Sequence, residues 1–166
     1  SRLFDMTYIA NRIKNILTDE HAARLSPWGY IEQEEIYIAG RANYAYRVMG
    51  IQQLDYMDLF KKFGYTYSGI ENYKLDTVGE VVLGVKKIDY SEYKSLNELY
   101  LKDFQKYTDY NIRDVDIVDR LEDKMGLIDL ALTIAYKGKV NYVETFGTVG
   151  VWDCILYNEL KQRGII

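Results

Sequence analysis

Two aspartates and one tyrosine carry most of the chemistry that this sequence offers. Asp5 opens an apolar-periodic stretch, so we expect its carboxylate at the point where a strand gives way to a helix. Tyr110 and Asp114 stand four residues apart in a helical pattern, which places the phenol and the carboxylate on one helix face. Carboxylates can hold divalent metal ions and a phenol can orient an attacking water, so these side chains suit phosphodiester hydrolysis.

Each of these residues also has an ordinary structural explanation. Asp5 is well placed to cap a helix, Tyr110 could pack half-buried in a chain with 17 tyrosines, and Asp114 could be a solvated charge. The acids that follow spread around the helix axis, which is more typical of a solvated face than of a metal cluster. They are Asp116, Asp119, Glu122 and Asp123. The spacing alone therefore leaves both interpretations open.

The blocks of sequence around these residues are more specific than the residues themselves. Residues 4–9 surround Asp5 and residues 110–115 contain Tyr110 and Asp114. Five further blocks accompany them in order, at 12–15, 24–27, 54–63, 72–80 and 151–158. Together they resemble the second and third exonuclease motifs, with their surroundings, of the proofreading domain of family B DNA polymerases. The resemblance is strongest to polymerases of T-even-type bacteriophages and covers nearly the whole chain.

The resemblance implies a fold, an activity and a set of residue roles. The fold would be α/β and RNase H-like (DnaQ-like), truncated at its N-terminus and carrying an inserted β-hairpin. Residues 1–166 would be the C-terminal portion of a 3′–5′ exonuclease domain that hydrolyses the primer 3′ end with two ions of Mg²⁺ or Mn²⁺. Asp114 would hold the ion that activates water, Tyr110 would hydrogen-bond the nucleophile and Asp5 would support the second ion. We therefore expect Asp5 and Asp114 to converge on one cleft bordered by Tyr110.

The sequence departs from this family at one important point. The first exonuclease motif of the family is Asp-x-Glu, and this sequence contains no Asp-x-Glu. We therefore expect a fragment of a longer protein that degrades DNA poorly by itself, because two carboxylates of the metal site are missing. The alternative hypothesis is a non-catalytic RNase H-like module with a structural or docking role.

The resemblance also names partners and a location, with which the composition agrees. The partners would be the single-stranded primer 3′ end, the primer-template and the remainder of the polymerase chain, in the cytoplasm of an infected bacterial cell. A net charge of −4 argues against a free-standing basic nucleic-acid binder. The lone Cys154 excludes an internal disulfide framework, and no stretch resembles a signal peptide or a membrane span. Lys61, Lys62, Lys86 and Lys87 could meet DNA phosphates, but solvated surface lysines are the better interpretation.

The length of 166 residues predicts a single domain with an α/β order of elements. We expect helices over 5–17 and 19–25, then a hairpin of strands 31–38 and 43–52 with Gly40 near its tip. In the related phage polymerases this hairpin holds strands apart, so it should project from the domain and be more mobile than the helices. A third strand is expected over 54–57, followed by a short helix capped by Asp58.

The second half of the chain is predicted to be mostly helical. A helix over 75–83 should end at Gly84, and Ser95 with Glu98 forms a capping box that opens a helix toward Tyr107. Asp109 should cap the next helix, and residues 148–163 should form the last one, closed by Gly164. Between these two helices, residues 139–146 look extended. The inward face of the helix after Asp109 is predicted to consist of Ile112, Val115, Val118, Leu121 and Met125.

Overall fold

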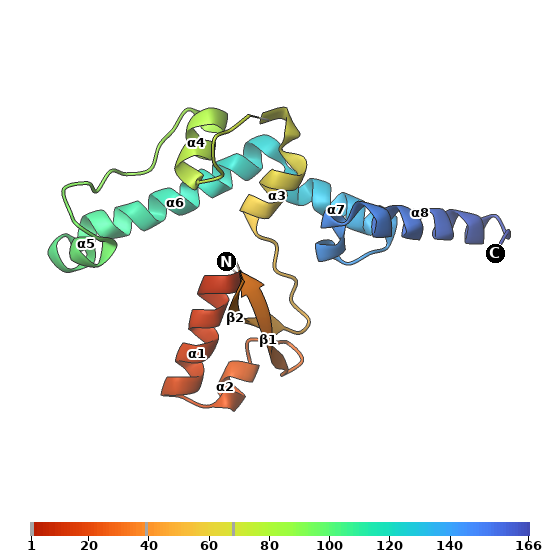
Figure 1. Ribbon diagram of the computed structural model, residues 1–166, viewed down its shortest axis with the longest axis horizontal. Helices are drawn as coiled ribbons and strands as arrows, with labels where there is room; N and C mark the ends of the chain where they lie inside the picture. Colours follow the sequence, from red (N-terminus) through yellow and green to blue (C-terminus); the bar gives the residue numbers. More distant parts are fainter. Residues whose placement is uncertain (1, 39, 68) are drawn as a thin grey trace. The chain divides into compact units, whose positions relative to one another are not determined.

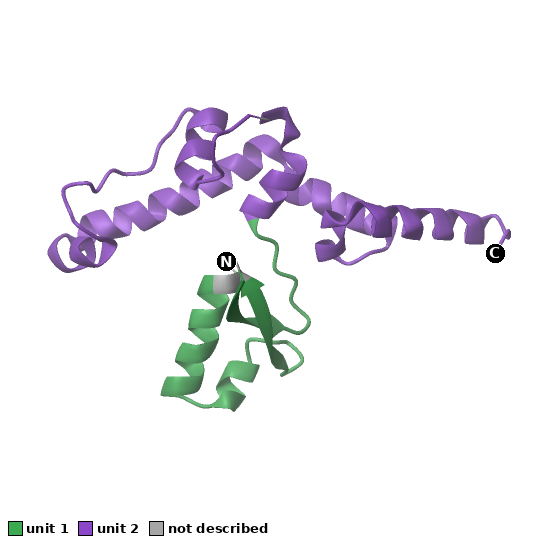
Figure 2. Cartoon of the chain, in the orientation of Figure 1, with its two compact units in different colours: residues 1–55 green, residues 56–166 purple. Residues whose placement is uncertain are grey.

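The computed structural model describes residues 2–38, 40–67 and 69–166, without the side chains of Arg2, Leu3 and Ile38. Ala39 in the predicted hairpin turn and Ser68 in the predicted loop lie outside the described residues. Where the length suggests a single unit, the chain forms two compact ones, residues 1–55 and residues 56–166 (Figure 2). Each is described by itself.

The first unit begins with helices and continues into a hairpin (Figure 1). A π-helical turn at Arg2–Met6 leads into α1 (Thr7–Ile16), and α2 (Asp19–Ala23) follows. The predicted helices are confirmed, but the strand expected before Asp5 is wrong, because Asp5 lies inside the helical turn. The cap position of α1 belongs to Met6, which makes no side-chain cap, so Asp5 is not an N-cap either.

The predicted hairpin is confirmed as β1 (Ile31–Ile38) paired antiparallel with β2 (Arg41–Val48). Gly40 has a φ of +76°, a conformation that favours glycine in a tight turn. Residues 40–43 are exposed, as a projecting hairpin requires, while the mobility of the hairpin stays a prediction. These are the only two strands in the described residues, and the third strand expected over 54–57 is wrong because residues 51–55 have no regular structure.

The hairpin and the two helices of the first unit share a small core. Buried alanines on α1, α2 and β2 allow these elements to pack closely around Val48 and the ring of Tyr46. The Tyr46 hydroxyl donates to Asn11 Oδ1 at 2.8 Å, which satisfies the polar end of a buried ring. The alanines are Ala10, Ala22 and Ala45.

The second unit is helical. It contains α3 (Tyr56–Phe63), a 3₁₀ turn (Tyr65–Tyr67), α4 (Leu75–Leu83), α5 (Leu96–Lys102), α6 (Phe104–Met125), α7 (Leu127–Gly138), a second 3₁₀ helix (Tyr142–Phe146) and α8 (Thr148–Gln162). Helices α4 and α5 both contact α6 (Figure 1).

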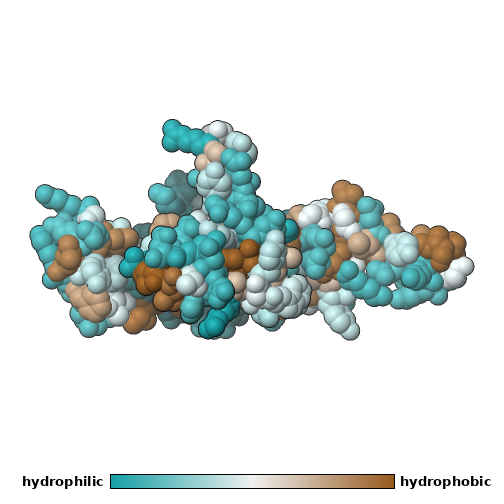
Figure 3. Space-filling model, turned by 90° about the horizontal axis from the view of Figure 1, so that it is seen from below, coloured by the Kyte–Doolittle hydropathy of each residue, from teal (hydrophilic) through white to brown (hydrophobic). Residues whose placement is uncertain are grey.

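Hydrophobic side chains remain exposed at the C-terminal end of α8, where Figure 3 shows hydrophobic surface. None of the helices in the described residues is long and apolar enough to cross a membrane.

Several predicted helix boundaries of this unit are confirmed. Gly84 ends α4 in the left-handed conformation with a φ of +71°, and Gly164 follows α8 with a φ of +65°. The Ser95 hydroxyl accepts the backbone N–H of Glu98 at 3.2 Å, as in a capping box. The Glu98 carboxylate accepts instead from the N–H of Lys94 at 2.7 Å, one residue before the expected partner.

Other boundaries were predicted wrongly. Asp58 lies in the first turn of α3 rather than before it, and Asp109 lies inside α6. The residue that caps α6 is Asp103, whose carboxylate accepts the N–H of Lys106 at 3.0 Å. Residues 142–146 are not extended but form a 3₁₀ helix, at whose start the Glu144 carboxylate accepts the N–H of Asn141 at 2.8 Å.

The buried face of α6 also differs from the predicted one. The predicted Leu121 is buried, but it is joined there by Ile117, whereas the predicted Ile112 and Val115 are 62% and 70% exposed. The close partner of Ile117 is Gly79 of α4, where an added Cβ would lie only 3.2 Å from Ile117 Cγ2. The glycine thus allows α4 to approach the face of α6 that carries Ile117, and this contact sets which side of α6 is buried.

Candidate active site on helix α6

Tyr110 and Asp114 lie on the same face of α6, as their spacing predicts, and one lysine contacts both. The Lys87 ammonium donates to Asp114 Oδ2 at 2.7 Å and to the Tyr110 hydroxyl at 3.1 Å. It also lies 5.1 Å from the centroid of the Tyr110 ring, within the range of a cation–π contact. The three side chains form one connected cluster.

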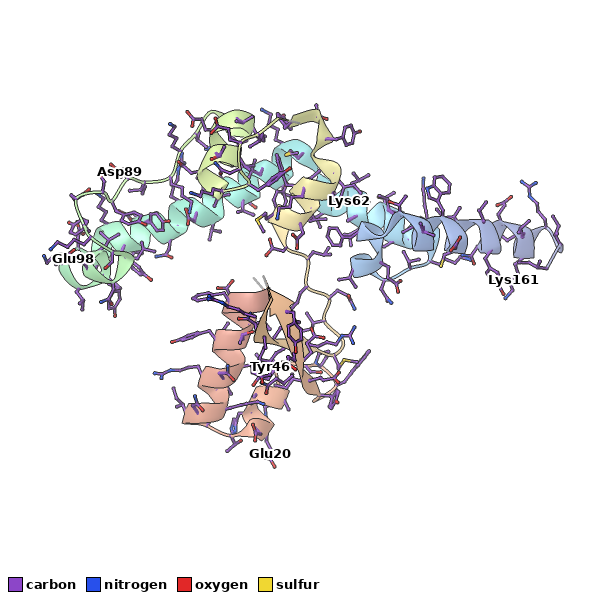
Figure 4. All side chains as sticks on the ribbon, viewed as in Figure 1. Glu20, Tyr46, Lys62, Asp89, Glu98 and Lys161 are labelled. Atoms are coloured by element: carbon purple, nitrogen blue, oxygen red, sulfur yellow. The ribbon has the colours of Figure 1, made fainter. Side chains whose placement is uncertain are left out.

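The segment that follows α4 brings Lys87 to this position. After Gly84 turns the chain, the backbone N–H of Val85 donates to the Gly79 carbonyl at 3.2 Å. Asp76 in the first turn of α4 then accepts the backbone N–H of Lys87 at 2.8 Å. The chain continues beside α6 through Asp89 (Figure 4), and these backbone contacts hold Lys87 opposite Asp114.

Two further contacts fix the neighbouring groups. The ring of Tyr90 meets the ring of Tyr110 edge to face, with centroids 5.3 Å apart. Arg113 Nε donates to the Lys86 carbonyl at 3.3 Å. A cavity of about 390 Å³ opens beside this cluster. It is lined by Asp76, Lys86, Lys87, Ile88, Asp89, Tyr90 and Tyr110.

The electrostatics of the cluster centre on the Lys87–Asp114 pair. The two side chains are only 25% and 28% exposed. Burial by itself would lower the pKa of Lys87, but its hydrogen bonds to Asp114 and Tyr110 outweigh this effect and raise the pKa above the usual lysine value. Lys87 is therefore positively charged at neutral pH and neutralises the Asp114 carboxylate.

The interpretation of both Lys86 and Lys87 as solvated surface lysines is wrong for Lys87. Lys86 is 61% exposed and pairs with Glu80 at 2.9 Å, as a surface lysine would. Lys87 reaches a residue 27 positions away in the sequence, so no local spacing indicated the contact. The available signal was its place after a helix-ending glycine, which turns the chain back toward the neighbouring helix.

Asp114 has one of the properties of a metal ligand. Its Oδ1 atom is buried and has no hydrogen-bond partner among the described residues, whereas Oδ2 is taken by Lys87. A carboxylate oxygen with unused lone pairs suits Mg²⁺ or Mn²⁺, so Asp114 fits the role of one ligand. The described residues contain no group of three or more His, Cys, Asp or Glu side chains that could hold a metal.

Two of the other acids of α6, Asp116 and Glu122, have structural partners, which agrees with their interpretation as part of a polar face. Asp116 pairs with Arg113 at 2.8 Å and with Arg120 at 3.7 Å. The Glu122 carboxylate accepts the N–H of Ile128 at 3.1 Å and so caps the start of α7.

Asp5 belongs to the first unit, where it is exposed on the π-helical turn. Its convergence with Asp114 on one cleft stays a prediction.

Comparison with known proteins shows which class of protein this chain resembles. Residues 2–78, which include Asp5, the hairpin and the start of α4, match the exonuclease domain of DNA polymerase family B. Over these residues the chain is similar to that exonuclease domain.

Two phage proteins show which members of the family it is similar to. The chain is 35% identical over 160 residues to the DNA-directed DNA polymerase of Escherichia phage RB69 and 33% identical over 158 residues to that of Enterobacteria phage T4. The matches cover 96% and 95% of this chain, so they include α6 and its cluster. The chain spans 17% of the length of each relative. The resemblance to T-even-type phage polymerases is confirmed.

Proposed function

We propose that residues 1–166 act as the C-terminal portion of a 3′–5′ proofreading exonuclease domain in a family B DNA polymerase. The observation that carries the proposal is the cluster of Tyr110 and Asp114 of α6 with Lys87 of the segment after α4, in a chain 35% identical to a DNA-directed DNA polymerase. The proposed fold of the complete domain is RNase H-like, with the hairpin of β1 and β2 as an insertion. The proposed location is the cytoplasm of an infected bacterial cell.

The substrate would be the 3′ end of a primer strand, and the residue roles follow from the side chains. Asp114 would hold one ion of Mg²⁺ or Mn²⁺ through the unused Oδ1, and Asp5 would hold a second. Such ions, when bound, acidify water and stabilise a leaving oxygen. The phenol of Tyr110 would donate to or accept from the attacking water and so orient it. The remainder of the polymerase chain and the primer-template would be the partners of this portion.

A chimaeric polymerase tests the proposal directly. Residues 2–166 would replace the matching stretch of the phage RB69 polymerase, and release of nucleotides from a mispaired primer end would be measured with Mg²⁺. We expect exonuclease activity that falls by about 10²-fold or more in Asp114→Ala and Asp5→Ala, because each change removes a metal ligand. Polymerisation by the same protein shows that the chimaera folds.

Asp116→Ala is the matched control, because this acid lies on the same helix but pairs with Arg113 and Arg120. It should leave proofreading nearly unchanged. A chimaera that polymerises but releases no nucleotides would contradict the proposal and favour the non-catalytic docking module.

The 166-residue chain by itself should degrade single-stranded DNA very poorly. Two metal ions need several anionic ligands, because Mg²⁺ gives up its water reluctantly, and the sequence lacks the Asp-x-Glu motif. Incubation with a labelled oligonucleotide and Mg²⁺ or Mn²⁺ measures this. Degradation that disappears in Asp114→Ala would show that the residues present are sufficient.

A further inference from the structure

Asp114 already holds a cation, which is the ammonium group of Lys87. The Lys87 Nζ lies 2.7 Å from Oδ2, in a pair whose side chains are about one quarter exposed. We propose that Lys87 is an exchangeable counter-ion of Asp114, because a divalent metal on the unused Oδ1 would repel the ammonium group on Oδ2, so that the two cations compete for one carboxylate. This inference rests on the metal role proposed for Asp114.

The competition follows from distance and charge. A divalent ion lies about 2.1 Å from a carboxylate oxygen, so an ion on Asp114 would lie within a few ångström of the Lys87 ammonium. Two cations this close repel each other, and the surrounding protein screens the repulsion less than bulk water does. When this repulsion displaces the ammonium group, its charge-assisted hydrogen bond to Oδ2 is also lost. Both effects lower the apparent affinity of Asp114 for the metal.

The structure offers the displaced ammonium a place to go. Lys87 already contacts the hydroxyl and the ring of Tyr110, so it can leave Asp114 without leaving the aromatic face. The carboxylates of Asp76 and Asp89 line the same cavity and carry the opposite charge. The backbone of Lys87 is held separately by Asp76, so the exchange requires rotation of the lysine side chain only.

Titration calorimetry with Mn²⁺ on the 166-residue chain tests the exchange. We expect Lys87→Met to bind Mn²⁺ about tenfold more tightly than the unsubstituted chain, because the competing charge is gone. Lys87→Arg keeps the positive charge and should stay close to the unsubstituted chain. Lys86→Met removes the neighbouring charge, which is paired with Glu80 instead, and should change the affinity much less.

A second measurement does not depend on the stability of a variant. In the unsubstituted chain, titration with Mg²⁺ should shift the NMR signal of the Lys87 ε-methylene group, while that of Lys86 should move little.

Thermal unfolding of each variant with and without Mn²⁺ completes the test, since Lys87→Met should be stabilised most by the metal.

The possible outcomes separate the two proposals. Equal Mn²⁺ affinity of Lys87→Met and the unsubstituted chain, with binding lost in Asp114→Asn, would overturn the exchange and leave the metal role of Asp114 in place. Failure of Lys87→Met to bind Mn²⁺ at millimolar concentrations would overturn the exchange, while the exonuclease assay of the chimaera decides the metal role of Asp114 independently. Tighter binding by Lys87→Met that disappears in the double variant with Asp114→Asn would support both.

Discussion

At the scale of single residues, the Lys87–Asp114 pair should matter for stability as well as for chemistry. Replacing Lys87 by Met leaves the half-buried Asp114 carboxylate without its cation, so we expect unfolding to require about 1–3 kcal/mol less free energy. Urea unfolding followed by circular dichroism measures this. Lys86→Met, which removes an exposed lysine, should change stability by only a few tenths of a kcal/mol. Equal losses in the two variants would contradict the assignment of Lys87 as the structural partner.

The sign of the pH dependence follows from the raised pKa of Lys87. A lysine whose pKa is higher in the folded state stabilises that state fully below the pKa of the unfolded residue. This contribution is lost as the pH rises through the higher pKa of the folded residue. The stability difference between the unsubstituted chain and Lys87→Met should therefore hold above neutral pH and shrink only in strongly alkaline solution.

At the scale of elements, the N-terminal end of α6 depends on Asp103. Its carboxylate accepts the N–H of Lys106, so Asp103→Ala should cost about 1 kcal/mol of unfolding free energy. Asp103→Asn keeps an acceptor oxygen at the same place and should recover most of that loss. The comparison of the two variants in urea measures the cap itself. A loss of equal size in both would attribute the effect to the charge rather than to the hydrogen bond.

The sequence predicts those elements whose signals are local and fails where the packing decides. Gly40 and Gly84 allow backbone conformations that other residues resist, so the hairpin and the end of α4 could be placed in advance. Asp103 and Asp109 are both suitable caps, and nothing local shows that the helix begins at the earlier one. The buried face of α6 depends on the contact between Gly79 and Ile117, which joins distant parts of the sequence.

In the candidate site, too, the sequence predicts the contacts that depend on local geometry and misses the one that depends on packing. The common face of Tyr110 and Asp114 follows from helix geometry alone, and the sequence predicts it correctly. Lys87 could not be found by spacing, because its position depends on the turn at Gly84 and on the bond from its backbone to Asp76. Residues 139–146 were expected to be extended, yet the Asn141–Glu144 hydrogen bond favours a helical turn.

At the scale of the whole molecule, the two compact units have separate cores. The first buries Tyr46 and Val48 of the hairpin, and the second buries Leu59, Ile117 and Leu121. Ile117→Ala should lower the stability of residues 56–166 by about 2–5 kcal/mol, because it leaves a cavity at a fully buried site. Amide hydrogen exchange should then accelerate in α4 and α6 but not in β1 and β2. Equal acceleration in both units would show that they unfold together.

The helical spacing of Tyr110 and Asp114 also restricts how the length of this region can vary. Each residue of an α-helix turns the chain by about 100°, so one residue inserted between 110 and 114 would rotate one side chain away from the other. Lys87 could then no longer touch both. The stretch from Asp89 to Lys94, by contrast, joins α4 to α5 outside any helix and can absorb added residues without turning α6. Insertions and deletions in natural variants of this chain should therefore fall in 89–94 and avoid the first turns of α6.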